Sequence, residues 1–212
     1  MLSRLLAFAF LFLTGLPLLA QSDGDDDKGW GLELGVRNTF SVFGDESLSP
    51  GFGGQFRIRP SDRLNTEWYL DYIKSDIDGL GSRRTLHIGW SVMFYPWKVP
   101  EEQLIEPYLL AGHCFDHAKV NPVQVSPEID PATQERWSSA LQLGIGSHFR
   151  VSERADFSLS AQYMTHLGNE LDVEKKEQNG RQYIEPVQKK KELSLEGHLL
   201  VTLSMNVKII KR

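Results

Sequence analysis

The chain has 212 residues, a formal net charge of −5, and 41% hydrophobic against 24% charged residues. This composition excludes a helical transporter, which needs several apolar stretches of roughly 20 residues. It also excludes a fully disordered chain, which combines low hydrophobicity with a high net charge. The acidic balance argues against a nucleic-acid partner, because phosphate binding needs a basic face. With Cys114 as the single cysteine, neither an internal disulfide nor a cysteine-rich metal site can form.

The first twenty residues have the pattern of a secretory signal peptide. Arg4 supplies the positive charge, residues 5–13 form an apolar run, and Ala20 is a small residue at the expected cleavage site. A membrane anchor is disfavoured because this run is too short to cross a hydrocarbon core about 30 Å thick. We therefore expect a signal peptide over residues 1–20, an acidic flexible lead-in over 21–28 and one exported domain over 29–212.

From residue 30 onward, apolar and polar residues alternate with the period of two that is typical of β-strands. In the first such segment, Leu32 and Leu34 are apolar and Glu33 between them is charged. Seven segments of this kind begin at Trp30, Phe52, Leu64, Thr85, Trp137, Phe157 and Leu193. Residues 108–115 form an eighth extended segment, but it is apolar on both faces, so its facing stays open. The pattern predicts eight strands.

The predicted connections alternate in length. Short turns are expected at residues 60–62, 96–105 and 152–154, and longer loops at 41–50, 74–84, 116–136 and 168–192. Most predicted strands also reach the roughly 9–11 residues that a membrane-crossing strand needs. Short turns on one rim and long loops on the other are typical of a transmembrane barrel. The sequence therefore predicts an all-β fold, an eight-stranded antiparallel up-and-down transmembrane β-barrel with short periplasmic turns and longer extracellular loops.

The two faces of the predicted strands differ in polarity. One face is broadly apolar, and its aromatic residues cluster at the strand ends in two groups. The group near the short turns is Trp30, Phe94, Trp97, Tyr108, Phe149 and Phe157. The group near the long loops is Phe40, Phe52, Tyr72 and Trp137. The other face carries charges of both signs: Glu33, Glu67, Asp71, Glu196, Arg37, Arg57, Arg59, Arg150 and Lys208. An oily ligand pocket cannot hold so many charges. We expect them to pair inside a plugged lumen, with Gln55 opposite Glu67 and Arg57 diagonal to that carboxylate.

Several segments carry a family resemblance. They are residues 30–35 (WGLELG), 107–112 (PYLLAG) and 141–146 (LQLGIG). With the signal peptide, these segments resemble small bacterial outer-membrane β-barrel proteins such as OmpX and the membrane domain of OmpA. The resemblance implies a location in the outer membrane of a Gram-negative bacterium. It also implies contact with outer-membrane lipid and lipopolysaccharide, insertion by the outer-membrane assembly machinery, and a non-enzymatic structural, adhesive or envelope-integrity role.

The histidines are the main candidates for chemistry. Strand parity places His87, His148, His166 and His198 in the lumen, leaves His113 uncertain and puts His117 in a loop. They lack the local spacing of a metal site, so we predict no metal or cofactor site. Residues 166–169 (HLGN) resemble the His-x-Ser-Asn stretch of outer-membrane lipid A deacylases, but Gly168 stands where the nucleophile would be, so we predict no catalytic residue. A membrane-embedded lipid A-modifying hydrolase and a secreted soluble ligand-binding barrel remain alternatives.

The last long loop is expected to contain an ordered hairpin. Asn179-Gly180 is a turn signal, and strand parity favours a three-residue turn that pairs Glu177 with Arg181. The same register sets Tyr163 opposite Leu195 and Ser160 opposite His198. Basic residues of this loop, Lys175, Lys176, Lys189, Lys190 and Lys191, are candidates for contact with anionic lipopolysaccharide. The protruding strand edges offer a surface for a protein partner.

Overall fold

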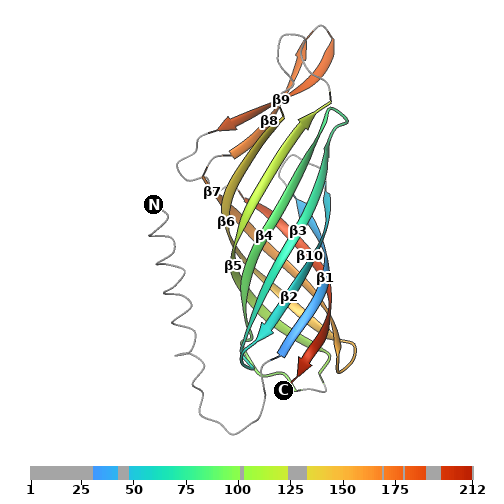
Figure 1. Cartoon of the computed structure of the whole chain (residues 1–212), viewed down its shortest axis with the longest axis vertical. Helices are drawn as coiled ribbons and strands as arrows, with labels where there is room; N and C mark the ends of the chain where they lie inside the picture. Colours follow the sequence, from blue (N-terminus) through green and yellow to red (C-terminus); the bar gives the residue numbers. More distant parts are fainter. Residues whose placement is uncertain are drawn as a thin grey trace.

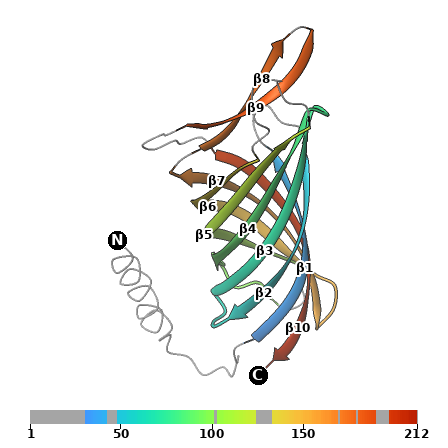
Figure 2. The same ribbon diagram turned by 45° about the horizontal axis from the view of Figure 1, so that its top comes forward.

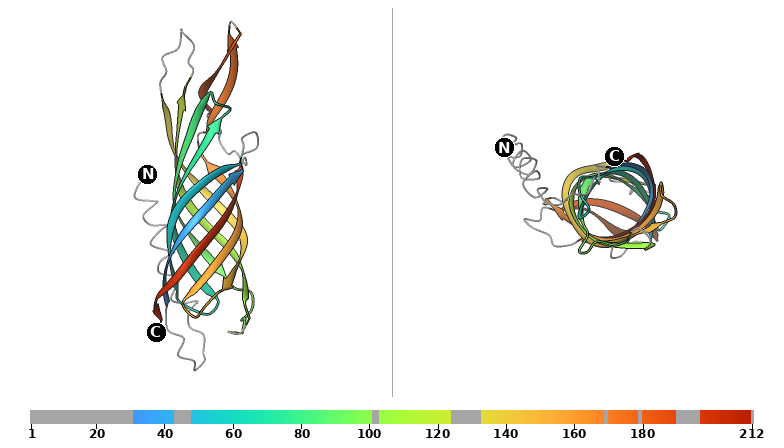
Figure 3. Two further views of the ribbon diagram at one scale, coloured as in Figure 1. Left: turned by 90° about the vertical axis from the view of Figure 1, so that its right-hand side faces the viewer. Right: turned by 90° about the horizontal axis from the view of Figure 1, so that it is seen from below.

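Eight strands close into one antiparallel barrel in the computed structural model, which describes residues 31–42, 48–100, 103–123, 133–168, 170–178, 180–189 and 197–211 (Figures 1 and 3). The barrel strands are β1 (Gly31–Val42), β2 (Ser49–Arg59), β3 (Leu64–Ile77), β4 (Gly81–Phe94), β5 (Ile105–Pro122), β6 (Gln134–Arg150), β7 (Ala155–Leu167) and β10 (Gly197–Lys211). Around the barrel they follow the order β1-β10-β7-β6-β5-β4-β3-β2. The predicted eight-stranded barrel is confirmed. No helix among these residues is long and apolar enough to cross a membrane.

The two ends of the barrel differ. β1 begins and β10 ends at the same end, which we call the terminal rim (Figure 1). The strands β8 (Glu170–Gln178) and β9 (Arg181–Lys189) form a separate two-stranded sheet beyond the opposite end, which we call the hairpin rim (Figures 1 and 2). Closing the sheet leaves no unpaired edge around the barrel wall, so the backbone polar groups of the wall are satisfied within it.

The strands near the hairpin rim extend further than the sequence analysis predicted. The range 74–84, expected to be a loop, is mostly strand, and a turn over residues 78–80 joins β3 to β4. Asp78 (φ 51°) and Gly79 (φ 70°) adopt the left-handed conformation that this tight turn requires. β5 likewise runs on to Pro122. The strand pattern continues through this extension, because Ile73, Ser75 and Ile77 stay buried while Lys74 and Asp76 face outward.

The outer wall of the barrel is apolar along its middle. Exposed residues such as Leu70 (46%) and Leu143 (69%) alternate with buried polar ones along each strand. The aromatic side chains expected near the two rims are mostly exposed as predicted: Phe94, Trp97, Phe149 and Phe157, and Phe40, Phe52, Tyr72 and Trp137. Tyr108 is the exception, because it points into the lumen and is only 3% exposed. Trp30 lies outside the described residues.

The hairpin is held against the barrel strands that extend beneath it. Leu171 of β8 and Ile184 of β9 are buried in one apolar cluster with Ile77, Leu80, Ala118 and Val120 of the extended barrel strands and the β3–β4 turn. An Arg83 guanidinium N–H donates to the Leu171 carbonyl oxygen (3.2 Å), and Lys175 forms an ion pair with Asp78. The hairpin is therefore a packed extension of this side of the barrel.

The register of the hairpin differs from the prediction. Gln178 pairs with Arg181 and Glu177 with Gln182, so the turn has two residues, with Gly180 in the left-handed region (φ 74°). The prediction assumed that the hairpin continues the barrel ladder, and strand parity then forbade a two-residue turn. The hairpin is instead its own sheet, and the chain bends at Gly168 (φ 115°) before β8 begins. The inward and outward facing of residues in the barrel strands therefore does not restrict the number of residues in the hairpin turn.

The expected pairing of the last barrel strand is also wrong. Tyr163 lies opposite Leu199, and Ser160 opposite Thr202, which is a displacement by four residues from the predicted partners. Leu195 lies outside the described residues. Because the displacement is an even number, the faces of both strands are still those expected, and His198 still points inward with 2% exposure.

Replacing Ile184 by aspartate should release the hairpin from the barrel. The substitution buries an unpaired charge in the apolar cluster, which is unfavourable. We expect limited proteolysis to cut residues 170–189 faster by at least about tenfold, since cleavage follows the population of the opened state. The gel mobility of the folded barrel should stay unchanged. The exposed neighbour Arg181→Asp is the control, and equal cleavage of the two variants would contradict the docking.

Candidate functional site: a closed polar lumen

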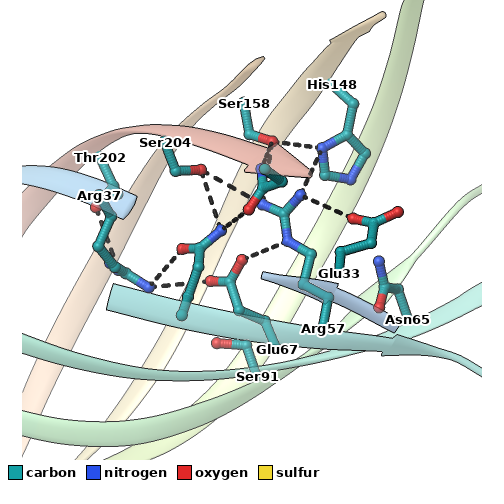
Figure 4. A network of polar contacts seen from close by, with 12 residues as sticks. Glu33, Arg37, Arg57, Asn65, Glu67, Ser91, His148, Ser158, Thr202 and Ser204 are labelled. Carbon is teal, nitrogen blue, oxygen red and sulfur yellow. Dashed lines mark hydrogen bonds and ion pairs between the residues drawn. The ribbon is translucent and has the colours of Figure 1, made fainter. Parts of the chain in front are cut away.

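Arg57 is the centre of an ion-pair network in the lumen, and its side chain is buried. Its Nε lies 2.7 Å from Glu67 Oε2, and its Nη1 lies 3.3 Å from Asp156 Oδ1 and 3.7 Å from Glu33 Oε2 (Figure 4). Its Nη2 donates to the Ser158 hydroxyl at 3.0 Å. One cation thus holds three carboxylates from three strands, which is the arrangement that a buried guanidinium needs.

Arg37 forms the second centre of the network. Its Nη1 lies 3.1 Å from Glu67 Oε1 and its Nε lies 2.9 Å from Asp71 Oδ1. The guanidinium also lies over the Tyr69 ring, 4.1 Å from the ring centroid, in a cation–π contact. Glu67 therefore bridges the two arginines with its two oxygens, so the network is continuous across the lumen (Figure 4).

The predicted ion pairing is confirmed, but its register is not. Arg57 lies directly opposite Glu67 in the β2–β3 ladder, whereas Gln55 lies opposite Tyr69. The prediction assumed a three-residue turn over 60–62, but four residues, 60–63, separate β2 from β3. The ladder ends with Ile58 opposite Thr66, whereas the assumed turn would set Ile58 opposite Leu64, so each partner moves along by two residues. This brings Arg57 closer to Glu67 than the diagonal pairing would.

A third set of charges lies at the terminal rim. Glu106 of β5 accepts from Arg59 (2.7 Å) and pairs with Arg150 (3.2 Å). In the same region, the His148 ring is hydrogen-bonded to the Tyr95 hydroxyl (2.9 Å) and to the Ser158 hydroxyl (2.6 Å). Arg59 and Arg150, two of the four arginines predicted to point inward, thus find a partner that was not predicted. Glu196 lies outside the described residues, and Lys208 lies opposite Glu33 at a bulge in the β1–β10 ladder.

Aromatic and apolar layers close the lumen between the charged groups. Tyr69 donates to the Gln142 side-chain oxygen (2.6 Å) and crosses the lumen over Gly89, where a Cβ would lie 2.5 Å from its hydroxyl oxygen. Tyr108 crosses over Gly146 in the same way. Buried apolar residues complete two layers: Ile73, Cys114, Ala140, Met164 and Leu200, and Met93, Tyr95 and Leu110. Cys114 is fully buried among them.

A histidine layer lies between the network and the hairpin rim. Asp116 Oδ1 lies 3.6 Å from His87 Nε2, and Asp116 Oδ2 lies 3.4 Å from His166 Nδ1 and 2.9 Å from Arg136 Nη2. The His198 ring stacks on both other imidazoles, with centroids 5.0 Å from His166 and 5.9 Å from His87. The predicted inward facing of these histidines is confirmed. No group of three or more potential ligands in the described part of the chain is arranged to hold a metal ion.

Strand parity could have identified the carboxylates that the sequence analysis missed. Asp156 alternates with Ser158 on β7, and Glu106 and Asp116 share the inward face of β5. The facing of β5 was undecided because its other inward residues, Tyr108, Leu110 and Cys114, are apolar. These residues build the closing layers, so the strand has an apolar pattern on both faces. His117 was expected in a loop, but it lies on the outer face of β5.

The structure describes residues 166–168 of the hydrolase-like stretch, whereas Asn169 lies outside the described residues. His166 points into the lumen against Asp116 and His198, and Gly168 is exposed at the end of β7. On the outer wall, His113 Nε2 is hydrogen-bonded to the Ser139 hydroxyl (2.8 Å), but no carboxylate among the described residues lies within ion-pair distance of His113. The strand N–H groups around this pair are used in the ladders, so they offer no oxyanion-binding donors.

The comparisons with known proteins show the fold. Neisserial surface protein A matches with a TM-score of 0.54 and 13% identity over 87% of this chain and 100% of its own. A major outer membrane protein from Thermus thermophilus matches with a TM-score of 0.53 and 10% identity over 85% of this chain and 99% of its own. Ail, the attachment invasion locus protein of Yersinia pestis, was solved with the heparin analogue sucrose octasulfate. It matches with a TM-score of 0.50 and 12% identity over 87% of this chain and 100% of its own. The chain has the fold of small outer-membrane β-barrels. No protein-family model and no curated protein sequence matches it.

Proposed function

We propose that the protein is a non-enzymatic barrel of the Gram-negative outer membrane with a plugged lumen and a structural, adhesive or envelope-integrity role. The observation that carries this proposal is the reversed polarity of the barrel. Large apolar side chains cover the outer wall, whereas charged and polar side chains fill the inside. Such a wall is favourable against lipid and unfavourable against water. The same reversal argues against a soluble ligand-binding barrel, which keeps its apolar face inside.

In this proposal the terminal rim faces the periplasm and the hairpin rim faces the outside of the cell. Outer-membrane barrels have short periplasmic turns, and two of the three connections at the terminal rim, over residues 60–63 and 151–154, are short, whereas the third spans 95–104. The β8–β9 hairpin then becomes the most prominent extracellular feature. Its two strands pair with each other and with no barrel strand, so their outer edges favour an adhesive contact with a protein partner by strand addition.

Envelope fractionation tests the location. We expect the protein in the outer-membrane fraction, extracted only by detergent, and migrating at different apparent masses before and after boiling. A closed barrel resists unfolding by detergent at room temperature, which is the cause of such a shift. Recovery from the periplasm without detergent would disprove the proposal and favour the soluble barrel. Lipid A profiles that differ between the wild type and His166→Ala would instead favour the hydrolase.

The role is tested by replacing residues 170–189 with a short Gly-Ser linker. An adhesive role predicts that cells lose attachment to host surfaces and keep their resistance to large antibiotics. An envelope-integrity role predicts the opposite pair of results. The barrel should fold in either case, because the hairpin is a separate sheet whose contacts with the barrel are limited to one apolar cluster and a few polar bonds.

The plugged lumen predicts very low conductance. An eight-stranded barrel encloses just enough room for side chains, and here Arg37, Arg57 and Tyr69 cross it with almost no exposure. Protein reconstituted in a planar bilayer should give no stable single-channel currents of porin size. As a positive control the same bilayer should respond to a general porin. Stable steps of porin size from the wild-type protein would refute the plug.

A further inference from the structure

A row of cations crosses three neighbouring strands on the outer wall near the hairpin rim. Lys74 on β3 lies opposite Arg84 on β4, and Arg84 lies opposite Lys119 on β5. Lys74 and Arg84 are exposed, and Lys119 is partly exposed. Neighbouring strands lie about 4.8 Å apart, so the three backbone positions span only about 10 Å. We call these three residues the cation row.

The cation row lies where the outer wall changes from apolar to charged. Two residues closer to the terminal rim, the same strands carry Tyr72, Leu86 and His117, and β6 carries Trp137. The His117 ring stacks on Trp137 with centroids 4.5 Å apart. Aromatic side chains at such a boundary lie at the level of lipid head groups. The cation row is therefore at the height of the phosphate groups of a surrounding lipid layer.

The protein neutralises this row only at one end. Neither Lys74 nor Arg84 forms an ion pair with a carboxylate in the described part of the chain. Lys119 Nζ lies 4.0 Å from Glu135 Oε2, and this oxygen is also 3.6 Å from His117 Nε2. Like charges directly opposite each other on neighbouring strands are destabilising. A bound anion would remove this repulsion.

Two other lysines near this rim already have carboxylate partners. Lys175 pairs with Asp78, and Lys176 pairs with Glu185, whose hydrogen bond raises the pKa of the Lys176 ammonium. Two of the five lysines predicted to contact lipopolysaccharide, Lys175 and Lys176, thus bind the protein's own carboxylates. The side chains of Lys189, Lys190 and Lys191 lie outside the described part of the chain. On the far side of the barrel, the outer face of β1 ends at this rim with the apolar residues Phe40 and Val42. In the described part of the chain, the cation row therefore does not extend to the outer face of β1.

We propose that Lys74, Arg84 and Lys119 bind the phosphorylated head group of one class of outer-leaflet lipid, a lipid A-type glycolipid. This inference rests on the proposed membrane location. The phosphates would lie against the three cations, and the acyl chains would lie along the apolar wall below Tyr72 and Leu86. Each basic residue close to an anionic lipid surface contributes about fivefold in affinity. A free phosphate would gain the charge contacts but not the apolar wall.

The test uses full-length protein folded in neutral detergent micelles and titrated with fluorescently labelled diphosphorylated lipid A. We expect the triple variant Lys74→Gln, Arg84→Gln and Lys119→Gln to bind at least about tenfold more weakly than the wild type. The matched control makes the same change of charge in the hairpin, with Lys175→Gln, Lys176→Gln and Arg181→Gln, and should bind like the wild type. Glu135→Gln should bind more tightly, because it removes the carboxylate that lies next to the row.

Three results would overturn the inference. They are equal binding by the wild type and the cation-row variant, a larger loss in the hairpin control, or displacement of the lipid by an equal concentration of inorganic phosphate. Dephosphorylated lipid A should bind the wild type and the cation-row variant equally weakly. The boiling-dependent gel shift of each variant shows that its barrel is folded. Because fractionation tests the membrane location separately, a protein found in the outer membrane with unaltered lipid binding contradicts only the cation-row site.

Discussion

Replacing Arg57 by methionine is expected to lower the free energy of unfolding of the barrel by about 3–5 kcal/mol. The substitution removes the one cation that contacts Glu33, Glu67 and Asp156. Glu67 keeps Arg37 as a partner, but the other two carboxylates remain buried without Arg57. Urea unfolding in lipid vesicles, followed by the fluorescence of the five tryptophans, measures the change.

A double variant separates the charge effect from loss of packing. Adding Asp156→Asn to Arg57→Met removes one of the uncompensated charges, so the two changes together should cost less than the sum of their separate costs. Arg181→Met, on the exposed hairpin, makes the same chemical change and should shift stability by less than about 0.5 kcal/mol. Additive costs, or an Arg57→Met variant as stable as the control, would show that the network does not hold the barrel together.

The barrel could be predicted from the sequence because its determinants are local. Period-two alternation fixes which residues of a strand share a face, so Glu33, Arg37 and Arg57 were placed in the lumen before any pairing was known. The same rule placed the three histidines of the histidine layer, His87, His166 and His198, in the lumen. The choice between an oily pocket and a polar lumen followed from the cost of burying charge, which depends on composition and not on register.

The register could not be predicted in the same way, because it depends on turn lengths that composition leaves open. The connection between the last paired residues of β2 and β3 is two residues longer than assumed, which changes the partner of Glu67 from Gln55 to Arg57. At the other rim, the prediction treated the hairpin as a continuation of β7 and β10. Its separation from the barrel depends on long-range packing of Leu171 and Ile184, which alternation does not reveal.

The candidate lipid-binding residues also depend on long-range packing, so the sequence alone did not reveal them. Lys175 and Lys176 are adjacent in sequence and suggested a basic patch, but the fold brings Asp78 and Glu185 to them. Lys74, Arg84 and Lys119 are far apart in sequence and fell within predicted loops. They become neighbours only because β3, β4 and β5 extend past the apolar wall in register.

Placing an arginine at Leu143 should distinguish a membrane barrel from a soluble one. Leu143 is the most exposed large residue of the middle of β6, with 69% exposure, and it lies halfway between the rim aromatics Trp137 and Phe149. In a bilayer, Leu143→Arg puts a charge at the midplane, which costs about 2–4 kcal/mol in a barrel. In water, a charge at an exposed position changes stability by less than about 0.5 kcal/mol.

The control for this variant is Leu104→Arg, at a residue just before β5 that is 67% exposed at the terminal rim. Near the interface the same charge costs only about 0–1 kcal/mol. We therefore expect Leu143→Arg to unfold at clearly lower urea concentration than Leu104→Arg in vesicles and to accumulate less in the outer membrane. The depth of the residue, and not its exposure, is then the cause of the difference. Equal stability of the two variants would mean that the apolar wall does not face lipid.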